Sequence, residues 1–240
     1  KLQYYQLALV SLDIVIQQQA NHAEALNLRG TVLAATKSYQ QALSSYQQAL
    51  AVKADYPVAL YHCGIVLEQL KRPQEAISYY QQAIALKPNY SKAISNLASL
   101  YMGLQQYSQA VEAFSQLLAV EPNYPYAAGK LFYAKAYCCD WRNYQQSVDK
   151  LVAAVRQQQK VITPFDFLNV TSTVDDEKIC AETYVQDRYP VALKPLWAGE
   201  RYQHEKIKVA YISADFYNHA TSILMIEMFE QHDTSRFEFV

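Results

Sequence analysis

The feature that most constrains this chain is a repeat with a period of 34 residues. Segments 26–54, 60–88 and 94–122 align at this offset, with small and large residues at fixed positions in all three. The recurring residues are the small Gly30, Gly64 and Ala98, the alanines Ala42, Ala76 and Ala110, and the aromatic Tyr46, Tyr80 and Phe114. A period of this length predicts stacked copies of one small helical unit, since a single unit cannot bury its apolar face alone.

Each unit is predicted to consist of two helices, called A and B in chain order. Small residues on both helices allow a close crossing, and the aromatic ring on helix B fills the space beside it. Pro88 and Pro122 close two of the units. The pattern resembles the tetratricopeptide repeat, and this resemblance implies a right-handed superhelix whose A helices line a concave groove.

The pattern continues on both sides of the three complete units. Helix-B positions before the first unit are occupied by Ala8, Leu12, Val15 and Ala20, so the chain opens with half a repeat. After Pro122, Leu131 continues a helix A, but Phe132 replaces the small residue and Tyr144 the crossing alanine. Terminal repeats are often atypical because one face meets a different neighbour. We therefore expect the repeats to occupy residues 1–139, with a degenerate fourth unit.

The A helices supply the predicted partner-binding groove. Its candidate positions form three rows: Glu24, Asn27 and Thr31; Val58, Tyr61 and Ile65; Lys92, Ser95 and Ser99. The main candidates for contact with a partner peptide are Asn27, Tyr61, Ile65, Ser95 and Asn96. Any one of these residues could instead be an ordinary solvated helix position. The groove as a whole favours binding, because a concave array of helices has few other uses.

Residues 140–206 are predicted to form a helical linker region. An apolar stripe predicts a helix over about 140–159, and a second helix is expected over about 175–189 with Thr173 as its N-cap. Between the two helices, Pro164 and several turn formers predict irregular chain. This irregular segment is expected to be packed by Phe165, Phe167 and Leu168.

The periodicity changes from helix to strand at residue 207. Residues 207–213 (IKVAYIS) predict a buried parallel strand, residues 220–232 an amphipathic helix, and residues 237–240 a second strand. This order is the first unit of a doubly wound α/β domain, in which ligands bind at the carboxyl ends of the strands. The polar loop 215–219 lies at such an end.

Two motifs after the repeats carry a second resemblance. CDWRNY at 139–144 and KIKVAYISADFYNHATSILM at 206–225 follow the repeats in an order that resembles the O-linked N-acetylglucosamine transferases and SPINDLY proteins. The resemblance implies that residues 207–240 begin a Rossmann-like glycosyltransferase lobe. Ser213, Asp215, Phe216 and His219 match the family motif S-x-D-F-x-x-H. In this family the matching histidine is a general base or a positioning group, which implies a catalytic role for His219 supported by Asp215.

The groove departs from the animal-type members of that family, which line it with a ladder of asparagines. The corresponding positions here are Leu28, His62 and Asn96, so only Asn96 matches.

Two functions from different classes therefore remain. In the first, the chain is the N-terminal part of a nucleotide-sugar-dependent protein O-glycosyltransferase that uses UDP-N-acetylglucosamine, with acceptor proteins recruited by the repeats. The resemblance places the donor site in a second lobe beyond Val240, so the chain alone is expected to be inactive and to bind no cofactor. In the second, the chain is a non-catalytic scaffold for protein–protein interaction.

Composition narrows the partners. A net charge of −1 argues against nucleic acid, and no apolar run is long enough to span a bilayer. The N-terminus starts on Lys1 inside a helical pattern and lacks signal-peptide features, which predicts a cytoplasmic piece of a longer protein. The apolar segment 207–240 is expected to pack on residues 141–189 or to form a homodimer.

The four cysteines match no zinc-binding spacing and are predicted to be buried, reduced thiols: Cys63, Cys138, Cys139 and Cys180.

Overall fold

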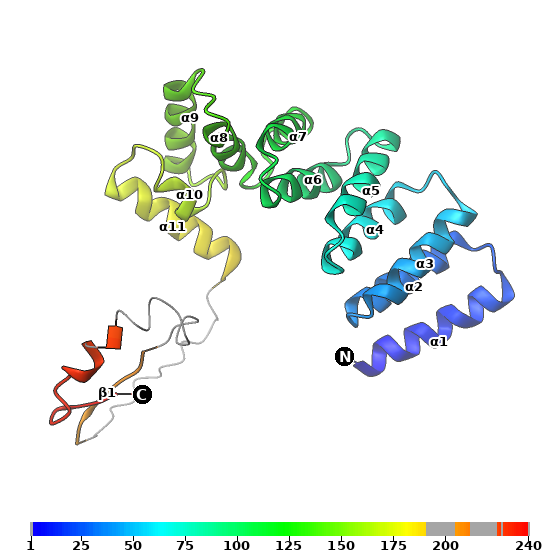
Figure 1. Ribbon diagram of the computed structural model, residues 1–240, viewed down its shortest axis with the longest axis horizontal. Helices are drawn as coiled ribbons and strands as arrows, with labels where there is room; N and C mark the ends of the chain where they lie inside the picture. Colours follow the sequence, from blue (N-terminus) through cyan, green and yellow to red (C-terminus); the bar gives the residue numbers. More distant parts are fainter. Residues whose placement is uncertain (1, 191–204, 212–224, 227, 240) are drawn as a thin grey trace. The chain divides into compact units, whose positions relative to one another are not determined.

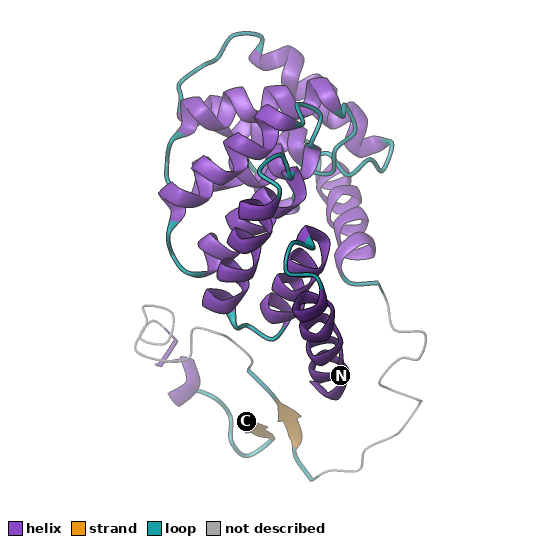
Figure 2. Ribbon diagram, turned by 90° about the vertical axis from the view of Figure 1, so that its right-hand side faces the viewer, coloured by secondary structure: helices purple, strands orange, loops and turns teal. Residues whose placement is uncertain are grey.

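A computed structural model describes residues 2–190, 205–211, 225–226 and 228–239. The chain divides into two compact units, residues 1–190 and 191–240, and each is described by itself. The described regular structure of the first unit is helical throughout, and the two strands belong to the second unit (Figure 2).

The first unit contains the predicted half repeat and three complete repeats. The half repeat is α1 (Leu2–Gln18). The complete repeats are α2 (Ala23–Ala35) with α3 (Tyr39–Val52), α4 (Pro57–Gln69) with α5 (Pro73–Leu86), and α6 (Ser91–Gly103) with α7 (Tyr107–Val120). Figure 1 shows these pairs stacked in chain order along an arc, with α6 on the inner side of α7. The first helix of each pair is helix A and the second is helix B.

The contact between helices A and B has the predicted composition. Ala42, Ala76 and Ala110 are fully buried, and the aromatic residues beside them, Tyr46, Tyr80 and Phe114, are at most 1% exposed. A Cβ atom added at Gly30 would lie 2.5 Å from the ring of Tyr46, and one added at Gly64 would overlap the ring of Tyr80. Glycine is therefore required where these rings press against helix A.

Four helices follow the third repeat: α8 (Ala127–Tyr137), α9 (Tyr144–Arg156), α10 (Pro164–Phe167) and α11 (Val174–Arg188). α8 continues the helix-A pattern and α9 begins at the predicted crossing residue. The helix expected from residue 140 begins only at Tyr144, because Asn143 before it has a left-handed backbone (φ 57°). The predicted N-cap of α11 is confirmed: Thr173 and Asp176 form a reciprocal capping box.

The segment between α9 and α11 corrects two packing predictions. The expected irregular chain contains the short helix α10, which starts where Thr163 caps the amide of Asp166. Phe167 is completely buried, but Phe165 and Leu168 are 75% and 63% exposed. A single turn of helix can direct only part of its side chains toward the core, and Phe167 occupies that face. The core it joins is formed by Val148, Leu151, Val155, Ile162, Phe167, Val170 and Cys180.

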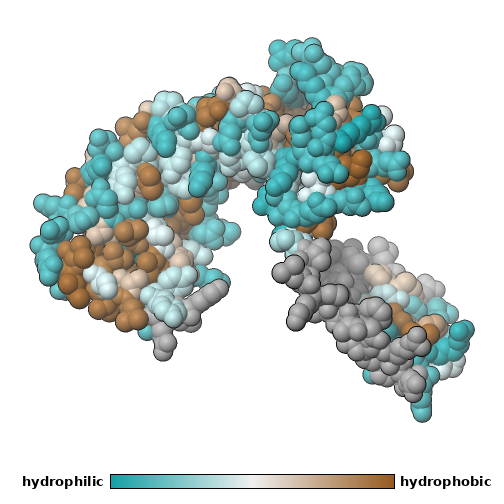
Figure 3. All heavy atoms as spheres, turned by 180° about the vertical axis from the view of Figure 1, so that it is seen from behind, coloured by the Kyte–Doolittle hydropathy of each residue, from teal (hydrophilic) through white to brown (hydrophobic). Residues whose placement is uncertain are grey.

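The N-terminal end of the first unit carries an apolar surface (Figure 3). On α1, Leu7, Val10 and Ile14 are 65%, 58% and 50% exposed. Within the first unit α1 packs against α2 alone among the described helices, which leaves these apolar side chains uncovered there. Contiguous apolar surface of this kind favours association with another surface.

The second unit contains two short strands, β1 (Ile207–Val209) and β2 (Phe237–Phe239). They pair in parallel with Ile207 opposite Phe237, as predicted, and the described part of the segment between them, around Met225–Glu230, is helical. The expected burial of β1 is wrong for Ile207, which is 59% exposed, because the described sheet has only two strands. The proposed packing of 207–240 on 141–189 or on a second copy stays a prediction.

Candidate functional site

The first predicted groove residue, Asn27, is buried instead of open to a ligand. Asn27 is 5% exposed, and its Oδ1 accepts a hydrogen bond from Nδ1 of His62 on the next helix A, at 3.0 Å. Burial lowers the pKa of His62 below its ordinary value of 6.5, which keeps the ring neutral at physiological pH. Asn27 therefore joins helices α2 and α4 and fixes the orientation of His62.

Tyr61 and Ile65 form a half-buried floor on α4. Both pack partly against the repeat core. The Tyr61 ring centroid lies 5.1 Å from that of Tyr90, 5.7 Å from that of His62 and 6.0 Å from that of Tyr80. Edge-tilted aromatic contacts of this kind hold a ring in place. Tyr61 can therefore offer a rigid apolar edge, but a substitution there would also disturb the core.

Asn96 lies above the central aromatic residue Tyr80. Its Nδ2 donates to the Tyr80 hydroxyl at 3.3 Å, and that hydroxyl donates to the carboxylate of Glu68. Burial, followed by the bond to Glu68, raises the pKa of Tyr80 far above its ordinary value of 10. The neutral phenol thus connects helix B of one repeat with helix A of the next.

The next residue in this row was missed by the sequence analysis. Lys130 on α8 follows Asn96 by one period of 34 residues and so continues the row of Leu28, His62 and Asn96. Lys130 is half-buried, and its Nζ donates to Oγ of Ser99 at 3.3 Å. Among the described residues, no carboxylate oxygen lies within 4 Å of this amine. The repeat register alone could have identified Lys130.

A pocket of about 520 Å³ opens at this end of the groove. Its lining comprises Ser95, Tyr124, Pro125, Tyr126, Lys130, Thr163, Tyr184 and Arg188. Of the five predicted groove residues, Ser95 is the one that reaches it. α11 supplies Tyr184 and Arg188, so the pocket combines a repeat surface with a helix that follows the repeats.

One carboxylate fixes α11 beside this pocket. Asp187 accepts a hydrogen bond from the Tyr126 hydroxyl at 2.7 Å and an ion pair from Lys160 Nζ at 2.5 Å. The bonds from Lys160 and Tyr126 lower the pKa of Asp187 below 3.8. Burial and then Asp187 raise the pKa of Tyr126 to about 12. This network holds Arg188, whose guanidinium lies 5.0 Å from the Tyr126 ring centroid.

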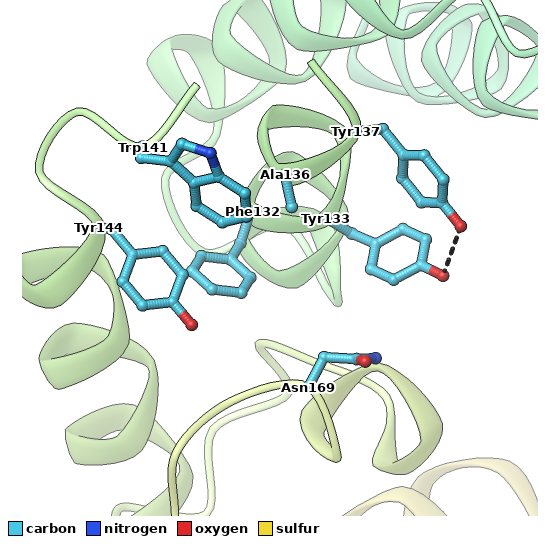
Figure 4. Close-up of a pocket in the computed structure, with 7 residues that line it drawn as sticks. All are labelled: Phe132, Tyr133, Ala136, Tyr137, Trp141, Tyr144 and Asn169. Atoms are coloured by element: carbon cyan, nitrogen blue, oxygen red, sulfur yellow. Dashed lines mark hydrogen bonds between the residues drawn. The ribbon is translucent and has the colours of Figure 1, made fainter. Parts of the chain in front are cut away.

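A second pocket, of about 350 Å³, is aromatic (Figure 4). Phe132, Trp141 and Tyr144 lie on one side, and the hydroxyls of Tyr133 and Tyr137 are joined at 3.1 Å on the other (Figure 4). Phe132 and Tyr144, the residues that break the repeat pattern, contact each other with ring centroids 5.4 Å apart. The degenerate fourth unit thus replaces the small crossing residues by a pair of rings.

The predicted catalytic residues His219 and Asp215 lie outside the described residues, as does the rest of the motif. In the described part of the second unit, the Tyr211 hydroxyl is 2.8 Å from Nε2 of His232. Their rings stack at 5.5 Å and connect the end of β1 with the segment before β2.

The cysteine prediction is correct for two residues only. Cys63 and Cys180 are buried, and burial raises the pKa of the Cys63 thiol to about 12. Cys138 and Cys139 are exposed, because they follow α8 at a turn where Cys139 has a left-handed backbone. Across the described ranges, no cluster of three or more His, Cys, Asp or Glu side chains is placed to hold a metal ion. None of the described helices combines the length and the apolarity that crossing a membrane requires.

The stacked helix pairs and the inward row of side chains define a helical-repeat protein. The chain contains tetratricopeptide repeats: family models described as tetratricopeptide repeat match residues 21–89 and 67–131. The curated proteins include no sequence that matches the chain.

Solved structures confirm the repeat fold. MamA has 19% identity and a TM-score of 0.58 over 64% of this chain and 90% of its own. MamA residues 41 to the end, from Desulfovibrio magneticus RS-1, has 23% identity and a TM-score of 0.56 over 64% and 87%. YrrB, described as a TPR protein with an unusual peptide-binding site, has 21% identity and a TM-score of 0.54 over 63% and 78%. Identities this low establish the fold alone.

Proposed function

We propose that this chain is a protein-interaction scaffold that binds an extended peptide segment of a partner along its A helices. The main supporting observation is the pocket at the end of the predicted groove, since Ser95 and Lys130 from two successive A helices both line it. A peptide lying along α4 and α6 would meet the half-buried edge of Tyr61 and then enter this pocket. YrrB, which shares the fold, is described as having a peptide-binding site.

The interior supports a rigid binding surface. Hydrogen bonds join Asn27 to His62 and Asn96 to Tyr80, so polar groups beneath the surface are already satisfied within the protein. A surface that is ordered before binding loses less conformational entropy when a peptide binds. The proposed function therefore needs no rearrangement of the repeats.

Peptide selection followed by a matched pair of substitutions tests this proposal. A displayed random-peptide library is selected against the full 240-residue chain, and affinities are measured by fluorescence anisotropy. Val58 on helix α4 and Val52 at the end of helix α3 are 38% and 40% exposed. Val58→Asp should weaken peptide binding about 10-fold or more, because it places a charge that loses water against the peptide. Val52→Asp should leave the affinity unchanged.

The two valines have nearly equal exposure, so both variants should have similar melting temperatures. Equal loss of affinity in both variants, or failure of the wild-type chain to select any peptide, would contradict the proposal.

A glycosyltransferase role is the second candidate, favoured by the parallel pairing of β1 with β2 around a helical segment. We propose that residues 207–240 begin an α/β lobe, and that the repeats deliver the acceptor protein to it. In this proposal UDP-N-acetylglucosamine is the donor, His219 acts as the general base or positions the acceptor, and Asp215 supports His219.

In a longer protein that joins this sequence to a donor-binding lobe, His219→Ala should lower turnover about 10²- to 10⁴-fold, as expected for loss of a general base. His232→Ala serves as the control histidine and should retain turnover. The measurement is transfer of labelled sugar from UDP-N-acetylglucosamine to a selected peptide that carries a serine. Near-normal turnover of His219→Ala would exclude the catalytic role.

A further inference from the structure

We propose that the pocket between Lys130 and Arg188 binds a carboxylate of the peptide in the groove. This inference rests on the proposed peptide-binding function and adds the chemistry of the ligand. The carboxylate would belong to an acidic side chain or to the C-terminus of the peptide.

Lys130 is the first reason for this assignment. The side chain is half-buried between α6 and α8, with Ser99 Oγ as its hydrogen-bond acceptor at 3.3 Å and the Phe114 ring centroid 6.0 Å away. An ammonium group carries three donors, and this contact uses one of them. Burial is the main cause that lowers the pKa of Lys130 below 10.5, and the charge of Arg188 lowers it further. An incoming carboxylate would relieve both effects.

Arg188 supplies the second cation of the pocket. Its Nε lies 3.5 Å from Asp187, a loose contact, because that carboxylate already accepts from Lys160 and from the Tyr126 hydroxyl. The side chain is 53% exposed, and its position over the Tyr126 ring holds the guanidinium at the pocket. A guanidinium presents five donors in a planar fork, so donors remain for a second carboxylate.

The acids near the pocket are committed to other partners. Asp187 is shared among three donors. Asp166 accepts from Thr163 Oγ1 at 2.7 Å at the start of α10. Neither carboxylate lies within 4 Å of Lys130 Nζ, so the protein itself leaves the amine without an ion pair among the described residues. Two cations that share a pocket repel one another, and an anionic group between them removes this repulsion.

The position of the pocket identifies the carboxylate as part of a peptide. Ser95 and Lys130 follow Tyr61 and His62 along the same rows of the repeat. A chain bound along the A helices would therefore present a side chain or its C-terminus to the pocket. Tyr124 and Tyr184 complete the walls with rings that would shield the ion pair from water.

Pairs of peptides that differ only at the carboxylate test the inference. The probes are peptides selected against the wild-type chain, each remade with Asp→Asn or Glu→Gln replacements and, separately, with an amidated C-terminus. The wild-type chain should bind the acidic form of one pair about 10-fold or more tightly than its amide. The pair that shows the difference identifies the source, side chain or C-terminus.

Three variants locate the effect. Lys130→Gln and Arg188→Gln should each reduce this preference at least about threefold, by weakening the acidic peptide and not its amide. Lys150→Gln, which removes an exposed charge on α9, should retain the full preference. Arg188 is half-exposed, so its variant stays informative if Lys130→Gln melts at a lower temperature.

The outcomes separate the two proposals. If the acidic and amide forms bind the wild-type chain equally while Val58→Asp still weakens both, the carboxylate site is wrong and the groove stands. A preference that survives in both Lys130→Gln and Arg188→Gln also overturns the site. If no peptide is selected, or if Val58→Asp and Val52→Asp behave alike, the peptide-binding function itself fails.

Discussion

Tyr80→Ala is expected to lower the free energy of unfolding by about 3–5 kcal/mol, the range found when a large buried aromatic side chain is removed. Tyr80 is fully buried between helices A and B of the second complete repeat, against Gly64. The glycine adds no side chain that could move into the cavity, so the space would stay empty. Chemical denaturation of the full chain measures this change.

Two further variants separate the contributions of Tyr80. Tyr80→Phe keeps the ring and removes the hydroxyl that bonds to Glu68 and Asn96, so it should cost about 1 kcal/mol. Tyr4→Ala removes a ring that is 76% exposed on α1 and should change stability by less than about 0.5 kcal/mol. Similar losses for Tyr80→Ala and Tyr4→Ala would refute the repeat packing described above.

Phe167→Ala should have an effect of similar size on a different part of the chain. Phe167 is fully buried in the cluster formed by α9, α10 and α11, which is distinct from the cluster of the repeats. A loss of about 3–5 kcal/mol is expected there. Because helical repeats are stabilised mainly by their nearest neighbours, the damage should remain local.

Hydrogen exchange measured by mass spectrometry tests this locality. In Phe167→Ala, amides of α9 and α11 should exchange faster, while those of α3 and α5 keep their wild-type protection. Phe165→Ala is the control, because Phe165 is 75% exposed on the same short helix. Equal acceleration along the whole first unit would show a single cooperative core instead.

The repeats could be predicted because a period of 34 residues constrains every unit at the same positions. Three independent copies of the small-residue and aromatic pattern agree, and only one packing of two helices satisfies all of them. The cap at Thr173 was predictable for a different reason, since a hydroxyl before an acidic turn satisfies free amides locally. Both are short-range or repeated signals.

The pocket escaped sequence reasoning because it depends on a tertiary contact without periodicity. Lys130 continues the repeat register, but Arg188 reaches the pocket through the bonds of Asp187 with Lys160 and Tyr126, which no local pattern encodes. The burial of Asn27 was missed because a polar residue on helix A was assigned to solvent, whereas His62 satisfies it inside. Similarly, sequence cannot decide which of Phe165 and Phe167 turns inward.

The most direct test of the central claim, that a peptide lies along the A helices, is an amide NMR titration of the full chain with a selected peptide. The account predicts that shifts are concentrated on α4, α6 and α8, including Val58, Ser95 and Lys130, while the amides of α3, α5 and α7 change little. Shifts concentrated on those B helices, or around Trp141 and Tyr144 in the aromatic pocket, would contradict it.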